Sequence, residues 1–76
     1  MSELSKKINS FYKTATKSEI SKINNEINFS EHLYLVYTMF YIQHKDIDFI
    51  SYSTGYSRGK IEADLRLIRK QLNKLL

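Results

Sequence analysis

The stretch from Ile47 to Leu72, IDFISYSTGYSRGKIEADLRLIRKQL, decides the fold that we expect for the whole chain. It predicts a short helix, a tight turn at Gly55 and a long second helix, because glycine adopts the positive φ that a sharp corner between helices needs. Ser57 is a candidate N-cap, whose hydroxyl accepts from the free amides of the next turn. Tyr56, beside it, is expected to be a buried hinge residue. These signals indicate a helix-turn-helix at about residues 46–72.

The second helix has two chemically different faces. Apolar residues recur at spacings of four, three, four and three, which is one helix face: Ile61, Leu65, Ile68, Leu72 and Leu75. The opposite face carries small residues and then cations: Gly59, Ala63, Arg66 and Lys70, with Glu62 and Asn73 beside them. Such a face suits close approach to the major groove of duplex DNA. We therefore expect a recognition helix from about Ser57 to Leu76; the alternative is a helical hairpin whose basic face is only solvated.

Length and composition limit the remaining possibilities. A chain of 76 residues forms one domain with a marginal core, which favours a homodimer. The absence of cysteine excludes a disulfide framework and thiolate metal sites, and fits a cytoplasmic protein. We expect neither a signal peptide nor a membrane-spanning segment, because no apolar run has the required length. We also expect no β-wing after the long helix, since the sequence ends at Leu76.

The positive charge is concentrated at one end of the sequence. Residues 1–29 carry five Lys and three Glu (+2), residues 30–57 carry one Lys and three acids (−2), and residues 58–76 carry six cations and two acids (+4). The total of +4 is modest, but its location on the expected recognition helix is typical of a protein whose affinity for DNA comes from phosphate contacts.

The first 29 residues predict an amphipathic helical arm. Helical spacing of apolar residues indicates a helix from Ser2 to about Lys13. Thr16 with Glu19 forms a capping-box pattern, which predicts a second helix from Lys17 to about Ile27, although one long bent helix is also compatible. The apolar residues of this arm are Leu4, Ile8, Phe11 or Tyr12, Ile20, Ile23 and Ile27. The arm either packs on its own core or pairs with a second copy.

The run from Leu33 to Gln43, LYLVYTMFYIQ, carries no charge and is apolar or aromatic almost all the way round. With Ser30 as N-cap, it predicts a central helix buried on every side, with a β-strand as the alternative that its branched and aromatic residues leave open. A helix buried in this way in so short a chain is a second reason to expect a homodimer. Asp46 then caps a short helix from Ile47 to Ser53, with Ile50 in the core.

From Asn28 onward the pattern resembles the helical core of the SarA/MarR-type transcription regulators. The matching segments are Asn28-Phe29-Ser30-Glu31, the run Leu33 to Ile42, Ile50, and Ile61 to Leu76 with the tail Leu72-Asn73-Lys74-Leu75. That family carries a wing after the recognition helix, and we expect none here. The wingless sigma region four and LuxR-type modules match the corner Gly55-Tyr56-Ser57 equally well. Either resemblance implies sequence-specific binding to a promoter or operator.

The sequence therefore predicts an all-α protein, a small helix-turn-helix domain of four to five helices without a β-wing. It is expected to be a single domain over residues 1–76, with an N-terminal arm (1–29) and a core (30–76). The expected function is a double-stranded DNA-binding transcriptional regulator, acting as a homodimer. The residues expected to contact DNA are Ser57, Arg58, Lys60, Arg66 and Lys70, with Tyr52 as a further hydroxyl donor to the backbone.

Other function classes receive less support from the sequence. His32 and His44 lack neighbouring acids at ligand spacing, and the chain has no phosphate loop or nucleophile elbow, so we expect no catalysis, metal or cofactor. The main alternative is a small protein-interaction module that docks its amphipathic helices on a larger partner protein, and Leu67, which lies off the apolar stripe, favours it. Binding of single-stranded nucleic acid through the six tyrosines is a third possibility.

Overall fold

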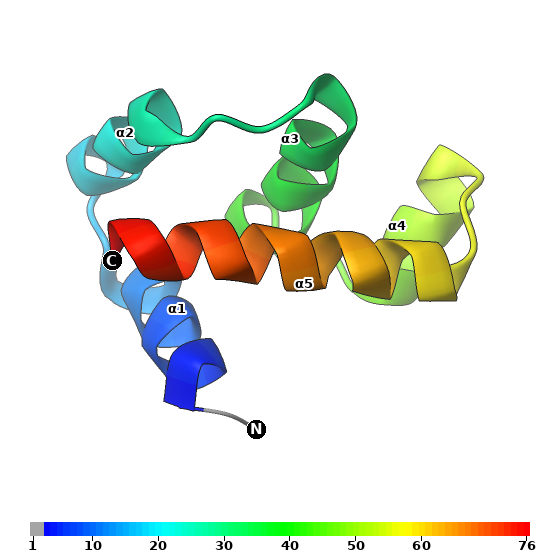
Figure 1. The fold of residues 1–76 in the computed structure, drawn as a ribbon, viewed down its shortest axis with the longest axis horizontal. Helices are drawn as coiled ribbons and strands as arrows, with labels where there is room; N and C mark the ends of the chain where they lie inside the picture. Colours follow the sequence, from blue (N-terminus) through cyan, green and yellow to red (C-terminus); the bar gives the residue numbers. More distant parts are fainter. Residues whose placement is uncertain (1–2) are drawn as a thin grey trace. The chain divides into compact units, whose positions relative to one another are not determined.

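The computed structural model describes the backbone of residues 3–76 and the side chains of residues 6–76, and within this range it holds helices and no strand (Figure 1). The all-α prediction is confirmed. The elements are α1 (Glu3–Thr14), α2 (Lys17–Glu26), α3 (Glu31–Tyr37), the π-helical segment η1 (Thr38–Ile42), α4 (Ile47–Thr54) and α5 (Arg58–Leu75). The expected start of the first helix at Ser2 lies outside the described residues. No helix in the described part is long and apolar enough to span a membrane.

The first two helices are separate. Their junction is set by Thr16, whose hydroxyl accepts from the Glu19 amide at 3.2 Å while the Glu19 carboxylate accepts from the Thr16 amide at 3.1 Å. This is the predicted capping box, and it starts α2 at Lys17 in place of one continuous bent helix. On the apolar faces, Ile8, Tyr12 and Ile23 are buried.

The central apolar run is helical but changes its geometry part-way. The Ser30 hydroxyl caps α3 by accepting from the Leu33 amide at 3.3 Å, and from Thr38 the backbone continues as η1. The segment ends where His44 takes a positive φ of 58°. The prediction of burial on every side is wrong for this chain alone: Val36, Tyr37 and Tyr41 are buried, whereas Tyr34 and Leu35 are exposed. The two exposed side chains lie on the face of α3 that has no core to pack against.

The helix-turn-helix forms as expected. The Asp46 carboxylate caps α4 by accepting from the Phe49 amide at 2.7 Å, and α4 ends at Gly55 in the left-handed conformation, φ 78°. Ser57 then caps α5, since its hydroxyl accepts from the Lys60 amide at 3.2 Å. The expectation that Tyr56 is buried is wrong. It is 46% exposed, and its ring packs against that of His32, with 4.7 Å between the ring centroids.

The predicted stripe of α5 forms the core for most of its length. Ile61, Leu65, Ile68 and Leu72 are buried, and Leu75 is partly exposed. Buried with them is one charged residue, Asp64. Burial of four large aliphatic side chains stabilises the helix by about 1.5–3 kcal/mol for each.

The helices group into two compact units. One unit contains α1, α2 and the end of α5 from Arg69; the other contains residues 29–68, with α3, η1, α4 and the first part of α5. The second unit therefore holds α4, the corner at Gly55 and α5 up to Ile68, while the residues of α5 from Arg69 belong to the first unit. The long helix α5 supplies residues to both.

Candidate nucleic-acid interface

The start of α5 is held in place by the corner that precedes it. The Ser51 hydroxyl of α4 donates to the Tyr56 carbonyl, and the Thr54 hydroxyl donates to the Ile50 carbonyl at 2.7 Å. Gly55 supplies the positive φ between these two contacts. Ser57, one of the expected DNA contacts, is exposed, but its hydroxyl accepts from the α5 backbone as the N-cap. Its role in the fold is therefore to start the helix.

Arg58 is exposed and paired with a carboxylate. Its Nε lies 3.1 Å from Oδ1 of Asp48, a residue in the first turn of α4. Both side chains are largely in water, so the pair stabilises the fold by about 1 kcal/mol at most. It nevertheless links the first residue of α5 to the preceding helix.

Lys60 is paired as well, with a partner that lies in the core. Its Nζ lies 2.9 Å from Oδ1 of Asp64, one turn further along α5. The Lys60 side chain is 48% exposed and that of Asp64 is 2% exposed. Because the ammonium compensates a buried carboxylate, moving it to a phosphate would leave Asp64 with one partner fewer. Lys60 is thus less suited to DNA contact than its sequence position suggests.

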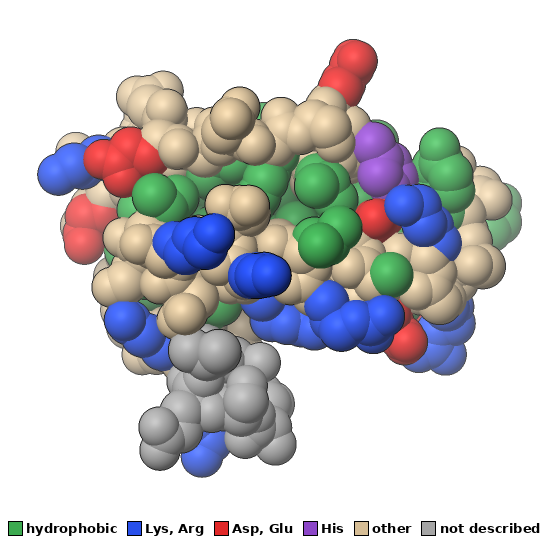
Figure 2. All heavy atoms as spheres, viewed as in Figure 1, with side chains coloured by type: hydrophobic (Ala, Val, Ile, Leu, Met, Phe, Trp, Pro, Cys, Tyr) green, Lys and Arg blue, Asp and Glu red, His purple; other side chains and the backbone are tan. Residues whose placement is uncertain are grey.

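Arg66 and Lys70 differ from these two cations. Both are exposed on α5, and within the described residues neither makes an ion pair or a side-chain hydrogen bond. Their spacing of four residues puts them on one face of the helix, one turn apart. Figure 2 shows Lys and Arg side chains along the length of α5 on the face in view. These two cations are free to neutralise phosphates.

Tyr52 projects from α4 into solvent. It is 90% exposed, the most exposed large apolar side chain in the described part of the chain. Its ring and hydroxyl are both available to a partner. The proposed site residues therefore share exposure, but they divide into those that already have a partner, Ser57, Arg58 and Lys60, and those that do not, Arg66 and Lys70.

A polar cluster behind the start of α5 was not foreseen from the sequence. Nε2 of His32, which the sequence left without a role, lies 2.6 Å from Oδ2 of Asp64. Burial acts to raise the pKa of Asp64, but the hydrogen bonds from Lys60 and His32 and their charges outweigh it, so that its pKa is below the usual value. The cluster therefore keeps an ionised carboxylate in the core and ties α3 to α5.

The chemistry open to this cluster is limited. His32 and Asp64 supply two metal-ligating groups, and no third His, Cys, Asp or Glu of the described residues completes a site with them. One signal in the sequence points to Asp64: it follows Ile61 by three residues, which puts a carboxylate on the flank of the apolar stripe. Its partner His32 lies 32 residues away, and local spacing gives no indication of it.

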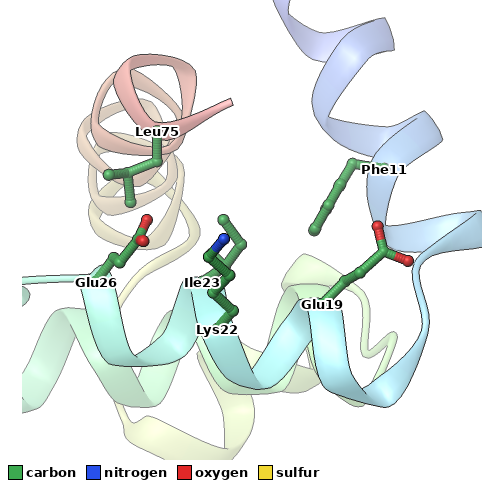
Figure 3. A pocket seen from close by; sticks show the side chains of 6 residues that line it. All are labelled: Phe11, Glu19, Lys22, Ile23, Glu26 and Leu75. Carbon is green, nitrogen blue, oxygen red and sulfur yellow. The ribbon is translucent and has the colours of Figure 1, made fainter.

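The other unit has a groove of about 390 Å³. Figure 3 shows Leu75 from α5 and Phe11 from α1 on the same side of α2, near Glu26 and near Glu19, at the two ends of the row Glu19, Lys22, Ile23 and Glu26 that α2 contributes. Its three charged side chains are exposed, and Glu19 already accepts hydrogen bonds as part of the capping box. The groove contains none of the residues predicted to bind DNA.

Comparison of the chain with models of protein families, with curated proteins and with solved structures finds no match. The resemblance to the SarA/MarR-type and sigma region four or LuxR-type modules therefore stays a prediction from the sequence pattern.

Proposed function

We propose that this protein binds duplex DNA as a sequence-specific transcriptional regulator, with α5 as the recognition helix in the major groove. The observation that carries the proposal is the pair α4 and α5, joined through the left-handed Gly55 and capped by Asp46 and Ser57. A helix-turn-helix of this kind presents the start of its second helix to base edges. The outer face of α5 is exposed there, as such a contact requires.

Charge supports the same orientation. Arg66 and Lys70 lie on the exposed face without partners in the described part of the chain, where they can neutralise phosphates beside the groove. Tyr52, at the end of α4, extends the same surface with a hydroxyl donor. The absence of cysteine fits the reducing cytoplasm in which such a regulator acts.

We expect the active form to be a homodimer. A core from 76 residues is marginal, and the exposed Tyr34 and Leu35 on α3 give a second copy apolar surface to cover. A symmetric dimer predicts a palindromic target whose half-sites are about one helical turn, 34–36 Å, apart. Sedimentation at micromolar concentration tests this part separately.

The decisive experiment is selection from a random-sequence duplex pool at low and near-physiological salt. We expect a palindromic sequence to be enriched at both salt concentrations. The double charge reversal Arg66→Glu with Lys70→Glu should abolish most of the binding and flatten its salt dependence, because two cations of each chain become anions at the interface. The matched control is Lys7→Glu with Lys17→Glu, two exposed cations on α1 and α2. Equal losses in both double variants would contradict the assignment of α5.

A second candidate function is docking on a larger protein. The observation that favours it is Leu67, which is 54% exposed on α5, together with the exposed Tyr34 and Leu35 of α3. The charged DNA backbone gains nothing from contact with apolar side chains, whereas a partner protein would bury them. Leu67→Gln, which adds no charge, discriminates between the two functions. If the ligand is DNA, the affinity for DNA should stay within a few-fold of that of the intact chain; if the ligand is a protein, capture of the protein partner should be lost.

A further inference from the structure

The pairing of Arg58 with Asp48 carries an inference about what the recognition helix reads, and it rests on the proposed function. Arg58 is the first residue of α5, where a recognition helix approaches base edges. Asp48 is in the first turn of α4, and its own backbone is fixed by the Asp46 cap. The pair therefore joins two rigid helices at the corner.

The contact leaves the far edge of the guanidinium open. It is made at Nε, on the side of the group, with 3.1 Å to Oδ1 of Asp48. The two terminal nitrogens, Nη1 and Nη2, then point past the carboxylate, and the side chain is 61% exposed. Two parallel N–H donors match the two acceptors of guanine, O6 and N7, whereas adenine offers one acceptor and one donor in the same places.

The carboxylate also disfavours the alternative ligand, a phosphate. Arg58 and Asp48 together carry no net charge, so the pair gains little from counterion release, and Asp48 itself repels a phosphate oxygen. The unpaired Arg66 and Lys70 are better placed to supply the phosphate contacts. The neutral pair of Arg58 and Asp48 would thus contact bases, whereas the unpaired cations Arg66 and Lys70 would bind phosphates.

We propose that Arg58 reads a guanine in the target duplex and that Asp48 is the positioning residue that directs its guanidinium toward the base. Lys60 does not share this role, because its ammonium pairs with the buried Asp64. The target half-site then contains one base pair at which guanine is preferred about tenfold or more over the other bases.

The test compares selection profiles of the intact chain and three single variants from the random duplex pool. Arg58→Ala should remove the guanine preference at one position and leave the slope of affinity against salt nearly unchanged. Asp48→Asn should weaken the same preference severalfold and steepen the salt slope, since an unbalanced Arg58 then contacts phosphate. Glu31→Gln is the control, an exposed acid of α3 outside the helix-turn-helix and without an ion pair in the described residues, and should change neither.

The outcomes separate this inference from the function on which it rests. Failure of the intact chain to enrich any sequence would overturn the proposed function. Enrichment with a uniform loss of affinity for Arg58→Ala would leave that function standing and make Arg58 a phosphate contact. A guanine preference unchanged in Asp48→Asn would remove the positioning role of Asp48. Circular dichroism of each variant establishes that it is folded.

Discussion

The first turn of α5 and its third and fourth turns carry the same number of proposed cations, but in different settings. Arg58 and Lys60 each face a carboxylate, Asp48 and Asp64, whereas Arg66 and Lys70 face solvent. The number of cations on a helix therefore does not indicate which of those cations are available to a ligand. A paired cation is positioned by its partner, and an unpaired one contributes its full charge to a phosphate.

Removing Asp48 and Asp64 one at a time should show the largest difference between the exposed and the buried carboxylate. Asp64→Ala should lower the free energy of unfolding by about 2–3 kcal/mol, since His32 and Lys60 lose their shared partner in a partly buried place. Asp48→Ala is the matched control and should cost less than about 1 kcal/mol, because its ion pair with Arg58 is exposed. Urea denaturation measures both. Equal costs would contradict the distinction.

Acid should weaken the same cluster. The unfolded chain binds a proton on Asp64 near the ordinary pKa of 3.8, while the pKa in the folded protein is lower because of Lys60 and His32. The stabilisation is therefore complete only above about pH 5, well above the unfolded pKa, and is lost as the pH falls through the folded pKa. The difference in urea midpoint between the intact chain and Asp64→Asn should narrow in acid. A constant difference down to pH 2 would show that the carboxylate is not the group that titrates.

Alanine substitution of Gly55, before α5, and of Gly59, in its first turn, should change the free energy of unfolding in opposite directions. Gly55→Ala should destabilise the protein by about 1 kcal/mol, because alanine at φ 78° is strained even though the space around it is open. Gly59→Ala should stabilise it by about 0.5–1 kcal/mol, since it lies within α5 and its new methyl group would meet only the Ser57 hydroxyl at 4.0 Å. Thermal unfolding of both variants is the measurement, and a shift of the same sign in both would count against the left-handed corner.

The smallest effect concerns the contributions of Lys60 and Lys70, two of the three lysines of α5, to DNA binding. Lys70→Ala should reduce the slope of log affinity against log salt by about 0.9, which is about threefold in affinity between 50 and 200 mM salt. Lys60→Ala should change the slope by less, because its ammonium is already paired with Asp64. Titration of duplex DNA by fluorescence anisotropy at four salt concentrations resolves the two slopes. A larger change for Lys60 would reverse the comparison.

Helix bounds were the part of the fold that the sequence predicted well, since caps are local. Thr16, Ser30, Asp46 and Ser57 all act within three residues, and each helix begins at the residue after its cap. The apolar stripe of α5 was equally readable, because its period is a property of one helix.

Features that depend on distant residues were not readable from spacing. The run from Leu33 to Gln43 has no polar face, so its sequence does not indicate which side of the helix is exposed. Nor does it indicate the change to π-helical geometry in η1 at Thr38. The position of Tyr56, at the surface and against His32 of α3, depends on a residue 24 positions away in the sequence. For the candidate site, the sequence identified exposed residues on α5, but the pairing of Arg58 and Lys60 depends on which carboxylates the fold brings close.

The division of α5 between two units has a consequence for the order of folding during synthesis. The residues of α1 and α2 leave the ribosome first, but their unit also requires α5 from Arg69 onward. The 40 residues from Phe29 to Ile68 must be synthesised in between, which takes about 2–8 s at an elongation rate of about 5–20 residues per second. During that interval Ile8 and Ile23 lack the third helix of their unit. The helix-turn-helix is made of neighbouring segments, so its contacts form before the first unit is complete.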